Sequence, residues 1–130
     1  MIARRVLRVR QRRASTVALQ GPLGSGKTTF IQGFFRELGI RSRAVSPTFI
    51  LIRRIPLSKR KFRNVFHVDA YRIGNRKEVL TLNLSEIFAD PTNIVMVEWA
   101  ERVGRIIPKE AMWLTFEHGR RKNDRMVTVE

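Results

Sequence analysis

The stretch that decides the fold lies at residues 21–28 and reads GPLGSGKT. It matches the pattern G-x-x-x-x-G-K-[ST], in which glycines let the backbone wrap a phosphate group with its N–H groups facing the anion. In this pattern Lys27 can reach the β and γ phosphates, and the Thr28 hydroxyl can bind Mg²⁺. The competing interpretation is a glycine-rich surface turn with an ordinary lysine. The residues predicted to contact a nucleotide here are Leu23, Gly24, Ser25, Gly26, Lys27, Thr28 and Thr29.

The segments on either side of this loop favour the phosphate-binding interpretation. An apolar run at residues 16–20 precedes the loop and is typical of a buried strand. Apolar residues recur at helical spacing over residues 27–38, and Gly39 is the expected C-cap of that helix. A strand, a glycine-rich turn and a helix therefore follow one another, as phosphate binding requires.

Two further apolar runs, at residues 64–69 and 94–98, predict strands that end in the carboxylates Asp69 and Glu98. Ligands of open α/β sheets bind at the carboxyl ends of the strands, so we expect the loop and both carboxylates at one edge of the sheet. For either carboxylate alone, the alternative is that it caps the following loop. His67 shares a strand face with Asp69, but a strand histidine is more often structural, and we assign it no catalytic role.

The remaining segments complete the predicted architecture. We expect a short helix at residues 2–12, an extended segment at 49–55, a basic loop at 56–63, two short helices within 75–89, and an antiparallel hairpin from 112–116 and 126–129. Trp99 and Trp113 are interpreted as packing residues rather than as residues that stack on a nucleotide. The loop at 119–122 is interpreted as a solvated turn, and its approach to the nucleotide is the alternative. The predicted fold is α/β: a single P-loop-like domain with a mixed sheet flanked by helices and an antiparallel C-terminal edge hairpin.

Basic residues are concentrated in the first half of the chain. The 130 residues include 26 Lys and Arg against 11 Asp and Glu, a formal net charge of +15. Residues 1–68 hold 16 of the basic residues and one acidic residue, so the whole excess lies there. A bound nucleotide carries only about four negative charges and cannot account for it. Three interpretations stay open: contact with RNA, an acidic protein partner, or general arginine enrichment that raises solubility.

The composition also limits the compartment and the chemistry. Cysteine is absent, which excludes disulfides, thiolate metal sites and cysteine nucleophiles and fits a reducing compartment. No apolar run approaches the ~20 residues of a membrane helix, and no secretory signal is visible. We expect a cytoplasmic protein of one domain over residues 1–130, with no membrane partner. Residues 1–13 also resemble a mitochondrial presequence, which ranks lower because they lead straight into the first strand.

Several ordered motifs together resemble one family. They are GPLGSGKTTF from residue 21, QGFFRELGI from residue 32, SPTF at 46–49, HVDAYR at 67–72 and VEW at 97–99. This series is similar to the TsaE (YjeE) family, the P-loop ATPases of bacterial tRNA threonylcarbamoyladenosine biosynthesis. The resemblance implies binding of ATP and Mg²⁺ and slow hydrolysis that assists a transferase complex. It also implies TsaD and TsaB proteins as partners.

The resemblance further implies roles for individual residues. Thr28 and Glu98 correspond to the Mg²⁺ positions, and Asp69 to a second essential carboxylate close to the hydrolytic water. Thr48 corresponds to a switch-like threonine near the γ-phosphate. With Lys27, the two carboxylates form the predicted catalytic set. The family's N-terminal region is normally longer and helps to hold the adenine, so we expect a shortened, basic version at residues 1–13.

Two other functions remain alternatives. A small-molecule kinase would share the phosphate-binding loop, although 130 residues leave little room for an acceptor pocket and a lid. A nucleotide-switched RNA-binding module would use the basic first half, including contact with tRNA.

Overall fold

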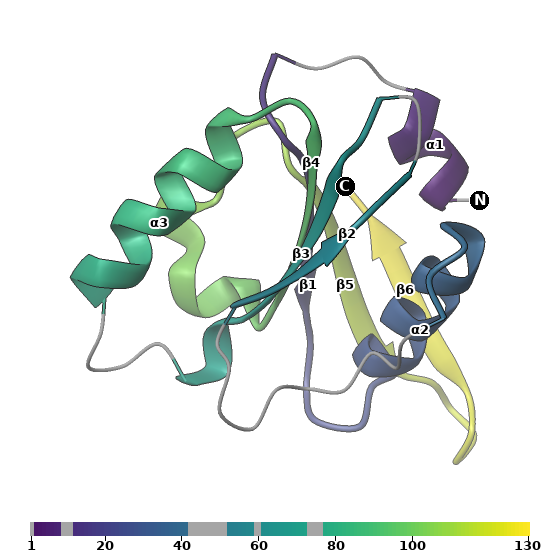
Figure 1. Cartoon of the computed structure of the whole chain (residues 1–130). Coiled ribbons are helices and arrows are strands. Elements are labelled where there is room, and N and C mark those ends of the chain that lie inside the picture. Colours follow the sequence, from purple (N-terminus) through teal and green to yellow (C-terminus); the bar gives the residue numbers. More distant parts are fainter. Residues whose placement is uncertain (1, 9–11, 42–51, 59–60, 73–76) are drawn as a thin grey trace.

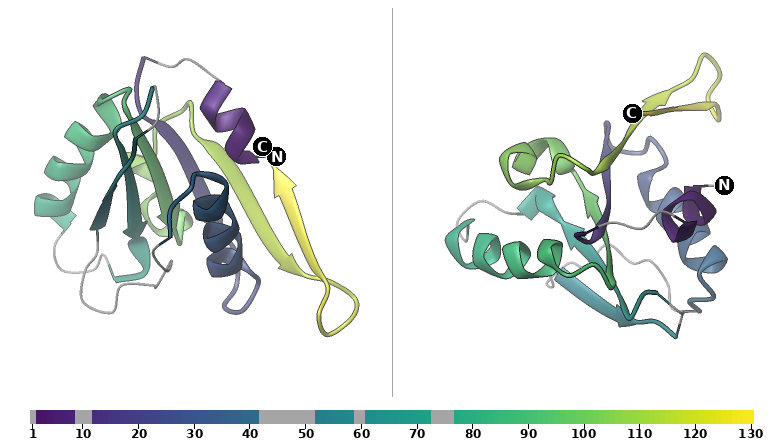
Figure 2. Two further views of the ribbon diagram at one scale, coloured as in Figure 1. Left: turned by 45° about the vertical axis from the view of Figure 1, so that its right-hand side comes forward. Right: turned by 90° about the horizontal axis from the view of Figure 1, so that it is seen from above.

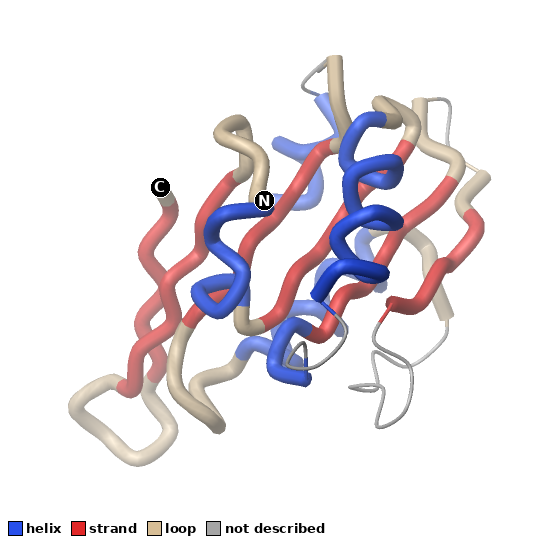
Figure 3. The backbone as a smooth tube through the Cα atoms, turned by 90° about the vertical axis from the view of Figure 1, so that its left-hand side faces the viewer, coloured by secondary structure: helices blue, strands red, loops and turns tan. Residues whose placement is uncertain are grey.

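The computed structural model describes residues 2–8, 12–41, 52–58, 61–72 and 77–130. Its centre is a six-stranded sheet in the order β2-β3-β4-β1-β5-β6 (Figure 1). The strands are β1 (Ser15–Gln20), β2 (Ile52–Pro56), β3 (Asn64–Asp69), β4 (Asn93–Glu98), β5 (Met112–His118) and β6 (Arg125–Val129). The four inner strands are parallel, whereas β2 and β6 pair antiparallel at the two edges. The mixed sheet and the C-terminal edge hairpin are therefore confirmed (Figure 3).

Helices cover both faces of the sheet (Figure 2). The helices α1 (Ile2–Arg8) and α2 (Lys27–Glu37) lie on one face, and α3 (Lys77–Ala89) lies on the other together with the 3₁₀ segment η2 (Ala100–Ile106). Strand side chains alternate between two apolar clusters. Leu19 and Met96 face α2, whereas Ala18 and Val97 face α3. Burial of these apolar side chains fixes the register of the inner strands.

Several segments differ from the sequence predictions. The first helix ends at Arg8, and Arg12 and Arg13 lie in a bend rather than in a helix reaching residue 12. The predicted pair of short helices within 75–89 is wrong for the described part, because residues 77–89 form one helix. Those thirteen residues contain neither glycine nor proline, so nothing interrupts the helical hydrogen bonds. The 3₁₀ segments η1 (Ala70–Arg72) and η2 were not predicted.

Other predicted boundaries hold closely. Ile40 N–H donates to Phe35 O at 2.9 Å and Gly39 N–H to Arg36 O at 3.0 Å, the paired hydrogen bonds of a helix C-cap. The extended segment appears as β2, which reaches Pro56, while residues 49–51 lie outside the described part. None of the helices in the described ranges is long and apolar enough to span a membrane.

The topology brings three strand ends together. In the parallel register, the Cα of Glu98 is paired with that of Asp69 on one side and with that of Leu19 on the other. The chain leaves β1 one residue beyond Leu19 and enters the loop at residues 21–26. The loop and both carboxylates therefore share the carboxyl edge of the sheet, as predicted from the ends of the apolar runs.

Candidate functional site

The loop between β1 and α2 forms a cradle of backbone groups. Gly26, the N-cap of α2, has φ 102°, a left-handed conformation that side-chain-bearing residues rarely adopt. At Gly21 a Cβ atom would lie 2.5 Å from the carbonyl oxygen of Phe116, so only glycine fits beside β5. The first N–H groups of α2 lack intrahelical partners and carry the positive end of the helix dipole. This end of α2 can therefore bind an anion.

A buried hydroxyl in the loop points to the same chemistry. Ser25 is 1% exposed, and its Oγ has no hydrogen-bond partner among the described residues. A buried polar atom without a partner costs roughly 1–3 kcal/mol. A phosphate oxygen in the loop could supply the missing partner.

The Lys27 side chain folds back over the loop. The residue is 6% exposed, and its ammonium group donates to Gly21 O and, at 3.1 Å, to Pro22 O. Its Nζ also lies 3.7 Å from the centroid of the Trp99 ring, within the range of a cation–π contact. Burial lowers the pKa of Lys27, and Glu101 and Glu98 offset this only in part. The ammonium is thus partly desolvated and lies beside the loop that could bind a phosphate.

Trp99 holds its ring over Lys27 through an unusual backbone conformation. Its φ of 57° and ψ of 40° lie in the left-handed region, which costs a non-glycine residue of order 1–3 kcal/mol. The ring centroid lies 5.1 Å from that of Tyr71, and the Arg102 guanidinium lies 4.3 Å from the Tyr71 ring centroid on η1. Trp99 also packs against the apolar cluster on the α3 face, as does Trp113. The packing prediction was right for both, but Trp99 borders the loop as well.

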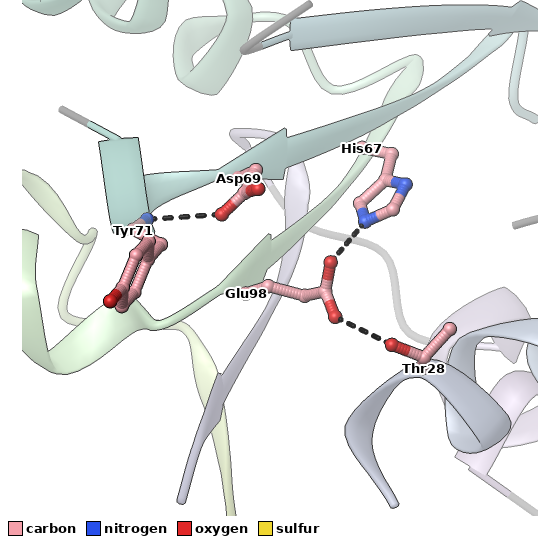
Figure 4. Close-up of polar contacts among 5 residues, drawn as sticks. All are labelled: Thr28, His67, Asp69, Tyr71 and Glu98. Atoms are coloured by element: carbon pink, nitrogen blue, oxygen red, sulfur yellow. Dashed lines mark hydrogen bonds and ion pairs between the residues drawn. The ribbon is translucent and has the colours of Figure 1, made fainter. Parts of the chain in front are cut away.

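Glu98 is the centre of a row of polar side chains (Figure 4). The residue is 3% exposed; its Oε1 accepts from the Thr28 hydroxyl at 3.3 Å, and its Oε2 lies 2.8 Å from His67 Nε2. A carboxylate only accepts hydrogen bonds, so Nε2 carries the proton in this contact. His67 is fully buried, its ring edge packs near Phe35, and its Nδ1 has no partner within the described ranges. The row joins β3, β4 and the first turn of α2.

Asp69 makes a different contact. The residue is buried, and its Oδ1 accepts from the Tyr71 backbone N–H at 3.0 Å at the start of η1. Figure 4 shows this carboxylate directed toward η1, whereas Glu98 reaches toward α2. Through this hydrogen bond Asp69 caps the segment that follows β3, which is the alternative role considered for this carboxylate in the sequence analysis. The proposed role of Asp69 near a hydrolytic water stays a prediction.

A cavity of about 700 Å³ opens beside the loop. All seven loop residues predicted to contact a nucleotide, Leu23 through Thr29, line it together with Glu98 and Trp99. Asp69 is not among its lining residues. Thr48 and the SPTF motif lie outside the described residues, so the structure does not place them.

Sequence reasoning missed the contribution of the C-terminal hairpin to this cavity. Phe116, Asn123, Arg125 and Val127 line its far side. Arg125 Nε donates to Gly24 O at 3.1 Å, and His118 Nε2 lies 3.3 Å from Leu23 O. Residues 120–122 are exposed, as expected of a solvated turn, but the residues on either side of them meet the loop. No local signal marks these residues, because about a hundred positions separate them from the loop.

The other missed residue is His67. Its two-residue spacing from Asp69 was visible and indicated a shared strand face. Its partner Glu98 lies 31 residues further along, and only the pairing of β3 with β4 brings the two side chains together.

A parallel strand that leads through a glycine-rich cradle into a helix, with a carboxylate at the end of the adjacent strand, defines the class of P-loop folds. The family model described as "Threonylcarbamoyl adenosine biosynthesis protein TsaE" matches residues 1–127, and the chain belongs to the TsaE family.

Similar proteins support this assignment. The chain is 43% identical over 98 residues to "tRNA threonylcarbamoyladenosine biosynthesis protein TsaE" of Nostoc sp., covering 68% of this chain and 54% of that protein. The protein of the same name from Borreliella burgdorferi is 35% identical over 100 residues, covering 76% and 70%, and that from Bacillus subtilis is 34% identical over 106 residues, covering 78% and 60%. The chain thus spans about half to two-thirds of the length of these relatives.

A solved structure has the same fold. The crystal structure of YdiB from Bacillus subtilis superposes with a TM-score of 0.65 at 26% sequence identity, covering 92% of this chain and 69% of YdiB.

Proposed function

We propose that this chain binds ATP with Mg²⁺ in the cavity beside residues 21–28 and hydrolyses it slowly, as an accessory subunit of the system that forms threonylcarbamoyladenosine in tRNA. The observation that carries the proposal is the polar row of Thr28, Glu98 and His67 beside the loop at residues 21–26, in which Glu98 and His67 are buried. Family membership and the names of the relatives support the tRNA-modifying context.

The residues of the site fit a magnesium ion bound together with a nucleotide. In the part of the chain that the structure describes, no group of three or more His, Cys, Asp and Glu side chains is placed to hold a metal by itself. Mg²⁺ commonly uses one or two protein oxygens and completes its shell with phosphates and water. Thr28 Oγ1 and Glu98 Oε1, 3.3 Å apart, are the proposed protein ligands. When bound, the ion neutralises charge on the β and γ phosphates.

The other residues of the site have separate roles in this proposal. Lys27 and the first N–H groups of α2 hold the phosphates in place. His67 fixes the rotamer of Glu98, so that one carboxylate oxygen stays directed toward Thr28. Asp69 orients the attacking water, and Thr48 senses the γ-phosphate; both roles follow from the family resemblance. Water positioning without a strong base is compatible with slow hydrolysis.

Calorimetric titration of the protein with ATP and Mg²⁺ tests the site. We expect Lys27→Ala to abolish measurable binding, because it removes the cation that faces the phosphates. Lys109→Ala is the matched control, since Lys109 is exposed and is not among the residues that line the cavity. Unchanged ATP affinity in Lys27→Ala would refute the proposed site.

The biological context has its own test. Deletion of the encoding gene should remove the threonylcarbamoyl modification from bulk tRNA, measured by mass spectrometry, and the intact gene but not Lys27→Ala should restore it. Co-purification with TsaD-like and TsaB-like proteins in the presence of ATP tests the proposed partners. Normal modification in the deletion strain would contradict this function.

Direct tRNA contact is a separate part of the proposal, supported by the position of exposed arginines. Arg12 and Arg13 precede β1 and Arg63 precedes β3, so they gather at the amino edge of the sheet, away from the nucleotide site. Reversing the charges at Arg12 and Arg13 to Glu should weaken tRNA binding and flatten its salt dependence, because fewer counterions are released. If this variant bound tRNA as tightly as the unaltered chain at both low and physiological salt, the result would argue against contact at this edge.

A further inference from the structure

The outer edge of β6 is a feature that nucleotide binding does not explain. β6 is the last strand in the sheet order, and within the described residues its one strand neighbour is β5. Figure 2 shows the hairpin of β5 and β6 projecting from the body of the molecule, with its tip beyond α2. An edge strand leaves a row of backbone N–H and C=O groups without strand partners.

The hydrogen bonds to β5 decide which backbone groups of β6 point outward. Glu130 N–H donates to Trp113 O at 2.9 Å, and Trp113 N–H donates to Glu130 O at 3.1 Å, so these residues form a hydrogen-bonded pair. In an antiparallel ladder such pairs alternate with pairs that exchange no hydrogen bond. Val129, the next residue in the register, is therefore of the second kind, and so are Val127 and Arg125. The N–H and C=O groups of these three residues point away from β5.

The turn end of the hairpin has the same phase. Gly119 N–H donates to Asp124 O at 2.8 Å, and Asp124 lies an even number of positions before Glu130. Even-numbered residues of β6 therefore bond to β5 at both ends of the hairpin, and odd-numbered residues face outward throughout. Successive outward positions offer the donors and acceptors that an added strand uses.

The side chains of β6 do not protect this edge. Met126 is 57%, Val127 43% and Val129 42% exposed, and the strand contains no proline. Proteins commonly protect an edge strand with charged side chains or proline, because an unprotected edge pairs with other chains. The opposite edge strand, β2, has two arginines in succession and ends in proline. The contrast marks β6 as the edge that is open to strand addition.

We propose that the outer edge of β6 binds an extended, acidic segment of another protein, which pairs with it as a further strand of the sheet. The main-chain groups of Arg125, Val127 and Val129 hold the segment, and the exposed valines contact its apolar side chains. This inference goes beyond the proposed nucleotide binding and does not depend on it.

The acidic character of the segment follows from the charge of the turn that joins β5 to β6. This turn and the first residue of β6 carry four exposed cations against the single acidic Asp124; the cations are Arg120, Arg121, Lys122 and Arg125. None of the four forms an ion pair with a residue that the structure describes. The guanidinium of Arg125 donates to backbone carbonyl oxygens, so no carboxylate neutralises its charge. Acidic side chains beside this end of β6 are therefore attracted.

A second copy of this chain fits the edge less well. Each copy carries a formal net charge of +15, so two copies repel each other. If two β6 strands paired antiparallel around Val127, Asp124 of one copy would lie opposite Glu130 of the other. Like charges directly opposite on paired strands are destabilising. The occupant that the charges favour is therefore a different protein.

A short capped peptide of alternating glutamate and valine is the probe, and its lysine–valine counterpart tests the charge. Fluorescence anisotropy of the labelled peptides at physiological salt measures binding to the unaltered chain. We expect the glutamate peptide to bind at least about tenfold more tightly than the lysine peptide, because the turn beside β6 is basic.

A proline at an outward position tests the edge itself. Val129→Pro removes one outward N–H group and leaves the hydrogen bonds to β5 in place, because the N–H of Val129 faces away from β5. This variant should bind the glutamate peptide about tenfold more weakly. Val129→Ala keeps the N–H group and is the matched control, which should stay within about threefold of the unaltered chain. Circular dichroism spectra that match those of the unaltered chain establish that both variants are folded.

Amide exchange followed by NMR locates the added strand. Exchange should slow at Arg125, Val127 and Val129 when the glutamate peptide binds, because their N–H groups gain partners. It should change little at Met126 and Thr128, whose N–H groups already face β5.

Each opposing result has its own meaning. Equal binding of the two peptides would overturn the acidic occupant. Equal binding by Val129→Pro and Val129→Ala, or no slowing at the outward amides, would overturn the edge as the binding site. Absence of binding at about 1 mM glutamate peptide would overturn the proposal as a whole. So would a dimer of the unaltered chain in light scattering that Val129→Pro dissociates, because it would assign the edge to a second copy.

Discussion

Two strands of one sheet, β4 and β6, both contribute residues to the cavity, but β4 is buried and β6 is exposed. Every residue of β4 is buried, and its last residue, Glu98, is held by Thr28 and His67. Every residue of β6 is exposed, and the strand pairs with β5 at the edge of the sheet. Groups that hold a metal and phosphates need a fixed geometry, which a buried strand supplies. A ligand group that makes mainly apolar contact can be bound by an edge strand.

The largest expected difference between β4 and β6 is in the rate at which their backbone amides exchange hydrogen with solvent. Amides of β4 should exchange with solvent at least on the order of a thousandfold more slowly than those of β6, because central strands open only near global unfolding while edges open locally. Hydrogen-exchange mass spectrometry of peptides covering residues 93–98 and 125–129 measures this difference. Similar exchange in both segments would remove the distinction between a rigid and an adaptable side of the cavity.

Removing the carboxylate of β4 should have the next largest effect. We expect Glu98→Gln to lower Mg²⁺-dependent ATP hydrolysis by about a hundredfold, since it removes charge at the proposed metal position. Steady-state phosphate release over a range of Mg²⁺ concentrations measures it. Glu86→Gln, which removes the charge of an exposed residue on α3, is the control. If hydrolysis survives Glu98→Gln and is lost with Asp69→Asn, the roles of the two carboxylates are reversed.

His67 is expected to affect both the stability of the fold and the rate of hydrolysis, because it is buried and contacts Glu98. His67→Ala should lower the free energy of unfolding by about 2–3 kcal/mol, because it leaves a cavity and a buried carboxylate without its partner. Hydrolysis should fall by roughly tenfold as Glu98 loses its fixed rotamer. His67→Gln, which keeps an N–H donor, should recover much of the activity in the same assay. Full activity in His67→Ala would show that Glu98 needs no such support.

The smallest effect concerns the pKa of Lys27. Since burial lowers this pKa below 10.5, the unfolded chain binds more protons than the folded one between the lowered value and 10.5. Folding stability relative to Lys27→Met should therefore rise with pH across that interval. Urea unfolding of both proteins at several pH values measures the difference. A relative stability that falls with rising pH would mean that contacts with Glu98 and Glu101 outweigh burial.

The sequence by itself determined the glycine-rich loop at residues 21–26, the strands that end in Asp69 and Glu98, and membership of the TsaE family. These features are local, because each is written in consecutive residues whose chemistry and spacing carry the information. The single helix α3 could also have been predicted from local sequence. Residues 77–89 contain no residue that breaks a helix, so the predicted division into two helices had no local support.

The tertiary structure alone decided which side chains complete the site. His67 meets Glu98 through the pairing of β3 with β4, and the Trp99 ring covers Lys27 through a left-handed backbone turn. Arg125 reaches Gly24 across 101 positions because β5 pairs in parallel with β1. Contacts of this kind depend on strand order, which the burial of whole sheet faces selects and no short stretch of residues encodes.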